Sequence, residues 1–251
     1  MYMNNESLSV VIVFGLVLLL GLIYAVIGFV TGAFRHYERV DRQGDSLLLG
    51  KSIMNFAVWG IEPFARWLCR RSVTPNQITL SSIIFGLLAA ACIATGHFGY
   101  AFSLALLSGV MDMLDGMLAR FIGKTDRSGE VLDSTVDRYV DFFLLAACAL
   151  YFRDDMLSLG ICLLAIFGSF MISYSTAKAE AMSVTVPRGA MKRTERYVYL
   201  LLGLAASGIW AELWLVGQPP IWLVLWLLAI LTNWSALTRF RALYLSAKGD
   251  M

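Results

Sequence analysis

Four aspartates, Asp112, Asp115, Asp133 and Asp137, lie in a chain that is otherwise apolar enough for a lipid bilayer. A charged side chain at membrane depth is costly and usually marks a functional site. Spacings of three and four residues place each pair on one face of a helix. If the two helices pack side by side, four carboxylates converge, and cations or protons must relieve their repulsion. The pattern therefore predicts membrane helices arranged around an ion site.

Composition supports a membrane protein with several crossings. Of the 251 residues, 59% are hydrophobic, and the mean hydropathy is +0.70. This range is typical of polytopic membrane proteins and excludes an ordinary soluble domain. The formal net charge of +2 does not point to a nucleic-acid partner, and none is expected. The four cysteines show no C-x-x-C pairing, so neither a disulfide framework nor a zinc site is expected.

The first long apolar segment, residues 9–32, carries no charge and is long enough to span a bilayer. A cleaved signal peptide is the alternative, but the run is too long and no basic residue precedes it. We therefore expect an uncleaved anchor helix. Residues 52–71 mix aromatic and basic side chains, which favours an amphipathic helix at the membrane interface. The expected division is an anchor and linker over 1–51 and a catalytic domain over 52–251.

Charge distribution predicts how the chain is oriented. Six further apolar segments are expected to span, at residues 77–96, 99–121, 129–152, 156–181, 193–215 and 220–240. With the amino terminus outside, the inner loops and segment ends hold 18 of the 20 lysines and arginines. Such an excess of positive charge is typical of the cytoplasmic side. The sequence thus predicts seven spans with a cytosolic carboxyl terminus, in the cell (inner) membrane.

The residues around the aspartates favour a site for divalent cations and phosphate. Oxygen-rich pockets suit hard cations such as Mg²⁺ or Mn²⁺, and four carboxylates are enough to neutralise two of them. Gly116, Ala119, Gly123 and Gly129 lie between the acidic pairs, where small side chains allow a ligand to approach closely. Arg120 can bind a phosphate through two parallel hydrogen bonds.

The same residues carry a family resemblance. The pattern D-x2-D-G-x2-A-R-x8-G-x3-D-x3-D is matched at all eight fixed positions, and the chain resembles the CDP-alcohol phosphatidyltransferases over roughly residues 52–245. This resemblance implies an all-α integral membrane fold with a six-helix core, to which the first span is an addition. The eight matched residues are Asp112, Asp115, Gly116, Ala119, Arg120, Gly129, Asp133 and Asp137.

The resemblance also implies roles for individual residues. Asp112, Asp115 and Asp133 correspond to metal ligands, with two ions per site. Asp137 corresponds to a fourth ligand that is also the general base toward the acceptor hydroxyl. The segment at residues 72–79 resembles a P-N-x-x-T element and also has the pattern of a capped helix start, and we expect it to be both. The positions implied to contact the CDP group are Pro75, Asn76, Thr79, Asp115, Gly116, Ala119, Arg120, Thr125 and Gly129.

The acceptor is the least constrained part of the prediction. Lys178, Arg193 and Arg196 resemble, by position and context, a subgroup whose acceptor is an inositol phosphate. They would then bind the acceptor phosphate, although a positively charged inner loop would hold such residues in any case. Glycerol 3-phosphate is the alternative acceptor, but the G-K-x-K-T-type segment often found with it is absent from the sequence. The family resemblance further implies a homodimer acting on a CDP-lipid such as CDP-diacylglycerol.

A non-enzymatic cation relay is the alternative of a different class, because intramembrane acids also serve ion pathways. A relay would be expected to spread its acids over several helices, whereas here they lie within 26 residues. Asp141, one turn beyond Asp137, is interpreted as a second layer around the metal site, an acid paired with Arg138, or polar lining.

Overall fold

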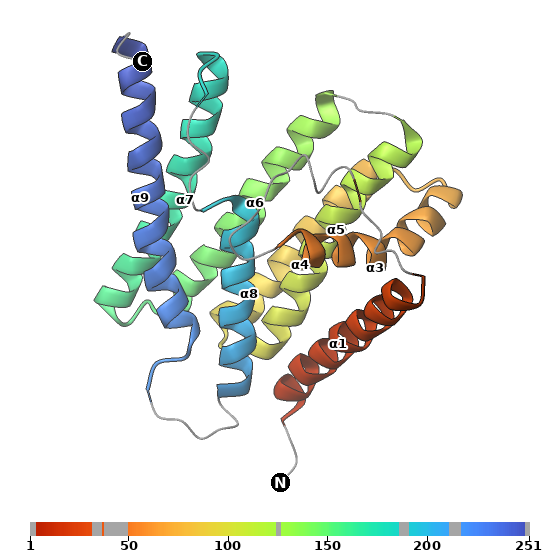
Figure 1. Cartoon of the computed structure of the whole chain (residues 1–251). Helices are drawn as coiled ribbons and strands as arrows, with labels where there is room; N and C mark the ends of the chain where they lie inside the picture. Colours follow the sequence, from red (N-terminus) through yellow and green to blue (C-terminus); the bar gives the residue numbers. More distant parts are fainter. Residues whose placement is uncertain are drawn as a thin grey trace.

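The structure is a computed structural model that describes residues 4–31, 37, 50–123, 127–185, 191–210 and 217–248. All regular secondary structure in these ranges is helical (Figure 1). Helix α1 begins at one end of the bundle, and the last helix, α9, ends at the opposite end. The helices are α1 (Asn5–Thr31), α3 (Lys51–Arg70), α4 (Pro75–Ala94), α5 (Phe98–Ile122), α6 (Arg127–Tyr151), α7 (Met156–Ala181), α8 (Arg193–Trp210) and α9 (Ile221–Lys248).

Five helices in the described ranges are long and apolar enough to cross a membrane: α1, α4, α5, α7 and α9. The predicted all-helical membrane fold with several crossings is confirmed. The sequence predicts two further spans at α6 and α8. These two helices also carry charged residues at one end, including Asp133, Asp137 and Arg193, which makes them less apolar than the other five.

Local sequence determines where the helices begin and end. At the start of α4, the Thr74 side chain accepts the N–H of Gln77, and the Gln77 side chain accepts the N–H of Thr74. Pro75 occupies the first helical position, where its missing N–H costs nothing. The predicted capped start of this helix is therefore confirmed. At its other end, α5 stops at Gly123, whose φ of 69° suits a residue without a Cβ.

The central feature of the bundle is the position of α4, which packs along both α5 and α6. The two acidic helices therefore share α4 as a neighbour instead of packing along each other. Close approach depends on small residues, as is usual between membrane helices. Ser108 of α5 donates to the carbonyl of Ser82 at 2.8 Å. A Cβ added to Gly86 would lie 3.1 Å from Val140 of α6.

Helix α1 is attached at its beginning to the rest of the bundle. Ser7 donates to the carbonyl of Gly208 in α8 at 3.0 Å, and a carboxylate oxygen of Glu6 lies 2.5 Å from His97 Nδ1. Gly99 and Gly208 let α1, α5 and α8 meet almost backbone to backbone. Most of the remaining surface of α1 is exposed and apolar, as expected for a helix that faces lipid.

Helix α3 packs across the part of α5 that carries the aspartates. Leu68 of α3 and Leu114 and Leu118 of α5 belong to one buried apolar cluster. On the same helix, Glu62 accepts the Tyr37 hydroxyl at 2.6 Å and pairs with Arg66 at 2.5 Å. The predicted amphipathic helix is thus present, and its apolar face supports the wall of the site.

The contact between Gly99 and Gly208 yields a stability prediction. In Gly208→Ala, the new Cβ would lie 2.7 Å from the Gly99 Cα, where only backbone could move away. We expect the free energy of unfolding to fall by about 1–3 kcal/mol, measured as a lower thermal midpoint in detergent. The matched control is Gly160→Ala in α7, whose Cβ would enter open space. Equal midpoints for the two variants would contradict the proposed close contact.

Candidate active site

Three carboxylates form the core of the site. Asp112 of α5 and Asp133 and Asp137 of α6 each offer an oxygen within 4.8 Å of the others. All three side chains are half-buried, so water screens their charges only in part. A set of carboxylate oxygens at this spacing fits a hard divalent cation. These three residues are called the carboxylate trio below.

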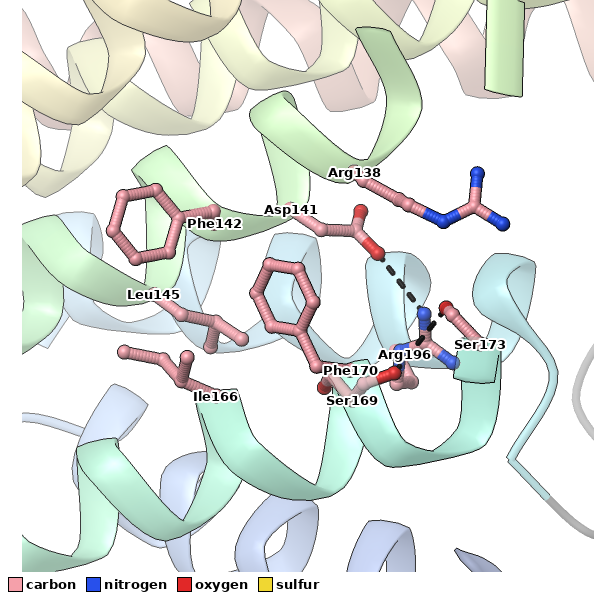
Figure 2. A pocket seen from close by; sticks show the side chains of 9 residues that line it. All are labelled: Arg138, Asp141, Phe142, Leu145, Ile166, Ser169, Phe170, Ser173 and Arg196. Atoms are coloured by element: carbon pink, nitrogen blue, oxygen red, sulfur yellow. Dashed lines mark hydrogen bonds and ion pairs between the residues drawn. The ribbon is translucent and has the colours of Figure 1, made fainter. Parts of the chain in front are cut away.

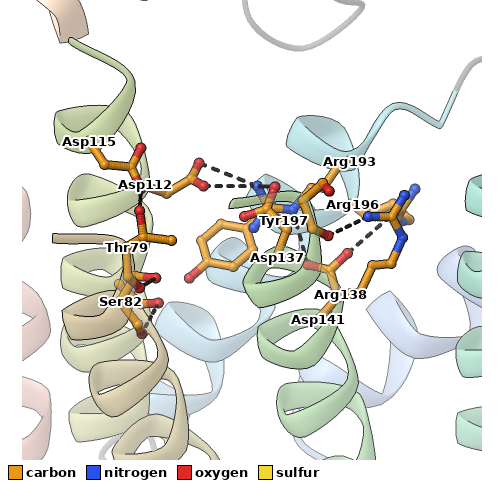
Figure 3. A network of polar contacts seen from close by, with 12 residues as sticks. Thr79, Ser82, Asp112, Asp115, Asp137, Arg138, Asp141, Arg193, Arg196 and Tyr197 are labelled. Carbon is orange, nitrogen blue, oxygen red and sulfur yellow. Dashed lines mark hydrogen bonds and ion pairs between the residues drawn. The ribbon is translucent and has the colours of Figure 1, made fainter. Parts of the chain in front are cut away.

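Asp115 does not belong to the trio. Its side chain is buried, and Oδ2 accepts a hydrogen bond from the Thr79 hydroxyl of α4 at 2.6 Å (Figure 3). The same hydroxyl lies 3.1 Å from the carbonyl of Pro75. The Thr79 contact therefore directs Asp115 toward the start of α4. The predicted convergence of four acids is seen in the structure as three acids together and a fourth beside them.

Asp115 and Asp133 line a cavity of about 650 Å³ between the start of α4, the end of α5 and the start of α6. A cavity of this size accommodates a nucleotide-sized ligand. It gathers eight of the nine positions predicted to contact CDP; the ninth, Thr125, lies outside the described residues. The cavity is lined by Thr74, Pro75, Asn76, Thr79, Asp115, Gly116, Ala119, Arg120, Ile122, Arg127, Gly129, Glu130 and Asp133.

Two arginines from the first turn of α8 face the acids. Arg193 NH1 lies 2.6 Å from Asp137 Oδ2 and 3.3 Å from both oxygens of Asp112 (Figure 3). Arg193 Nε lies 3.6 Å from Asp141, and Arg196 NH2 lies 3.0 Å from the other oxygen of Asp141. Arg193 and Arg196 are called the arginine pair below. The guanidinium of Arg193 thus lies against two of the three carboxylates of the trio.

The start of α8 fixes the arginine pair. Buried Glu195 accepts the backbone N–H of Lys192 at 2.9 Å, which ties the first turn to the residue before it. Lys178, predicted as a third acceptor ligand, lies exposed in the last turn of α7. Among the described residues, no ion pair joins Lys178 to the acids that the arginine pair contacts, so its role remains a prediction.

The pairing of Asp141 with both arginines was not predicted from the sequence. Figure 2 shows Asp141 and Arg196 meeting in a narrow pocket between α6 and α7, beside the ring of Phe170. With about 10 Å³ of free space, this pocket has no room for a substrate. The spacing of Asp141, one turn beyond Asp137, was the available signal, but its partners are more than fifty positions away.

Membrane-crossing helices with an acid-lined cavity at one end define the class: a multi-pass integral membrane protein with a site for a charged ligand. Residues 72–235 match the CDP-alcohol phosphatidyltransferase family, and the chain belongs to that family. This match covers the cavity, the trio and the arginine pair. The protein is therefore a CDP-alcohol phosphatidyltransferase, and the sequence-based assignment of family, enzyme class and transferase activity is confirmed.

Within this family, the chain is similar to several phosphatidylinositol phosphate synthases. The chain is 36% identical over 176 residues to the phosphatidylinositol phosphate synthase of Corynebacterium glutamicum, covering 67% of this chain and 77% of that protein. It resembles crystal structures of the Mycobacterium tuberculosis phosphatidylinositol phosphate synthase at 26% identity over 73% of this chain. One of these, with CDP-DAG bound, has a TM-score of 0.66 and is covered over 93% of its length. Another, with manganese and citrate, has a TM-score of 0.67 and is covered over 88%.

The buried bond between Thr79 and Asp115 yields a prediction. Thr79→Val keeps the shape of the side chain but leaves the Asp115 carboxylate without its hydroxyl donor. We expect the free energy of unfolding to fall by about 1–3 kcal/mol, followed by thermal denaturation in detergent. The control is Thr135→Val on α6, whose exposed hydroxyl donates only to the carbonyl of Val131. An equal fall in the free energy of unfolding in the two variants would show that the bond from Thr79 to Asp115 contributes no extra stability.

Proposed function

We propose that the protein transfers a phosphatidyl group from CDP-diacylglycerol to the hydroxyl of an inositol phosphate and releases CMP. The observation that carries this proposal is the arginine pair beside the carboxylate trio. An acceptor with a phosphate monoester brings two negative charges to an acidic site, so it needs cations nearby. Arginine is the residue best suited to this task because its planar guanidinium binds phosphate through two hydrogen bonds.

The position of the arginine pair supports a phosphorylated acceptor. Arg193 and Arg196 lie one turn apart on α8; Arg193 contacts the trio, Arg196 contacts Asp141 beside it, and neither lines the cavity at α4. The cavity and the pair thus offer two separate anion-binding regions with the trio between them. The relatives named as phosphatidylinositol phosphate synthases favour inositol phosphate as the acceptor.

For the donor, we propose that the cavity holds the CDP group. The lining residues predicted for this role come from three helices, and Arg120 and Arg127 add positive charge for the diphosphate. The trio, together with Asp115, would hold two Mg²⁺ or Mn²⁺ ions. When bound, such ions neutralise the diphosphate and stabilise charge in the transition state.

In the proposed reaction, Asp137 accepts the proton of the acceptor hydroxyl. The hydroxyl oxygen forms a bond to the phosphorus that carries the diacylglycerol, and the bond from that phosphorus to the CMP oxygen breaks. CMP leaves with the electron pair of that bond. The position of Asp137 in the trio, 2.6 Å from Arg193 of the arginine pair that would position the acceptor, supports this role.

The proposal includes location and assembly. We propose that the site faces the cytoplasm, with the amino terminus on the outer side of the cell membrane, because the inner loops carry most of the basic residues. A water-soluble acceptor can then reach the trio, while the lipid donor enters from the bilayer. We also propose a homodimer, with residues 1–51 acting as an anchor to the catalytic domain.

An acceptor panel tests the proposed function. Purified protein in detergent would receive CDP-diacylglycerol, Mn²⁺ and, separately, inositol 1-phosphate, glycerol 3-phosphate, free inositol and serine. We expect rapid CMP release with inositol 1-phosphate and little with free inositol, because the arginine pair then has no phosphate to bind. Faster turnover with glycerol 3-phosphate would make that compound the acceptor in place of inositol 1-phosphate. CMP release with none of the four would contradict it.

The general-base role of Asp137 predicts a large loss of turnover. In Asp137→Asn we expect kcat to fall by about a hundredfold or more, because an amide cannot accept the proton. Binding of CDP in the presence of Mn²⁺, measured by calorimetry, should be kept in part. The matched control is Asp154→Asn, since Asp154 is an exposed acid in the connection between α6 and α7. Unchanged turnover in Asp137→Asn would remove its assigned role.

A further inference from the structure

Arg193 contacts two kinds of acid. Its NH1 group binds Asp112 and Asp137, which belong to the carboxylate trio. Its Nε faces Asp141, which lies outside the trio. The side chain is only 31% exposed, so water screens its ion pairs only in part, and a second anion nearby would stabilise a displaced guanidinium.

The contacts of Arg193 with the trio engage two of the three carboxylates that a bound cation would need. The 2.6 Å contact uses Asp137 Oδ2, and the two 3.3 Å contacts use both oxygens of Asp112. A divalent ion ligated by these carboxylates would take over those lone pairs and repel the guanidinium. Arg193 is therefore a competitor for the metal site, built into the chain.

Asp141 offers Arg193 an alternative partner. Its Oδ1 lies 3.6 Å from Arg193 Nε, while its Oδ2 is bound by Arg196 at 3.0 Å. Arg196 is itself fixed, since its side chain is 8% exposed and it donates to the carbonyl of Met191 at 3.3 Å. A small rotation of Arg193 away from the trio would leave both arginines on one carboxylate, facing the acceptor side of the site (Figure 3).

We propose that Arg193 is the resident counter-ion of the metal site and that metal binding transfers it from Asp112 and Asp137 to Asp141. The acceptor phosphate site, Arg193 beside Arg196, is then complete only when metal is bound. This inference rests on the proposed function for the identity of the metal and the acceptor. It makes binding ordered, with metal before acceptor.

The inference predicts that loss of Arg193 strengthens metal binding. We expect Arg193→Gln to bind Mn²⁺ about tenfold more tightly than the wild type, within the usual range of coupling between two sites. Titration followed by electron paramagnetic resonance measures free Mn²⁺ directly and does not depend on turnover. The matched control is Arg196→Gln, which removes an equal charge from the same turn of α8 but no contact with the trio. Its affinity should change less than threefold.

The outcomes separate this inference from the proposed function. Wild-type protein that binds no Mn²⁺ would overturn the proposed metal site and, with it, this inference. Wild-type protein that binds Mn²⁺, with Arg193→Gln equal or weaker, would overturn the inference alone. An equal gain in Arg196→Gln would also overturn it, because general charge repulsion would then explain the effect.

A measurement on the unmodified protein keeps the inference falsifiable if Arg193→Gln does not fold. Phenylglyoxal reacts with arginine side chains, and mass spectrometry of peptides reports the extent of labelling at Arg193. We expect Mn²⁺ to raise the labelling rate of Arg193 about threefold or more, because its NH1 group loses its two partners, while buried Arg196 changes little. Labelling of Arg193 that is unchanged or slowed by Mn²⁺ would overturn the inference.

Discussion

Repulsion among carboxylates at membrane depth is the constraint on which the rest of this structure depends. Asp112, Asp133 and Asp137 lie close enough to share one ion, and such a cluster is unfavourable without a cation. In the structure Arg193 provides that cation from α8. The helix α4 holds the acidic helices at a fixed spacing, and the cavity opens where that spacing leaves room for a ligand.

Much of the fold follows from signals that are local in the sequence. Uncharged apolar runs define the spanning helices, and Thr74, Pro75 and Gln77 define the start of α4 before any tertiary contact is considered. The same holds for the site, because helical spacing places Asp133 and Asp137 on one face. The eight positions that line the cavity were found from the motif and its family resemblance, since residue spacing alone does not place α4 beside α5 and α6.

What the sequence did not reveal depends on contacts between distant segments. The separation of Asp115 from the trio results from one hydroxyl, that of Thr79, which lies 36 positions earlier. Asp141 meets Arg193 and Arg196 only because the first turn of α8 lies beside the middle of α6, and no local pattern reports that. The docking of α1 is similar, because Ser7 donates to the carbonyl of Gly208, which lies 201 positions later in the chain. In each case a single long-range contact decides where a polar group points.

We expect the acidic faces of α5 and α6 to hold divalent ions in place of Arg193. The most direct measurement is X-ray diffraction from crystals grown with Mn²⁺ and CDP, recorded at the manganese absorption edge. We expect anomalous peaks bounded by Asp112, Asp133 and Asp137, with Asp115 at their edge and the Arg193 guanidinium moved onto Asp141. A map without a peak among these carboxylates, with Arg193 still bound to Asp112 and Asp137, would contradict this expectation.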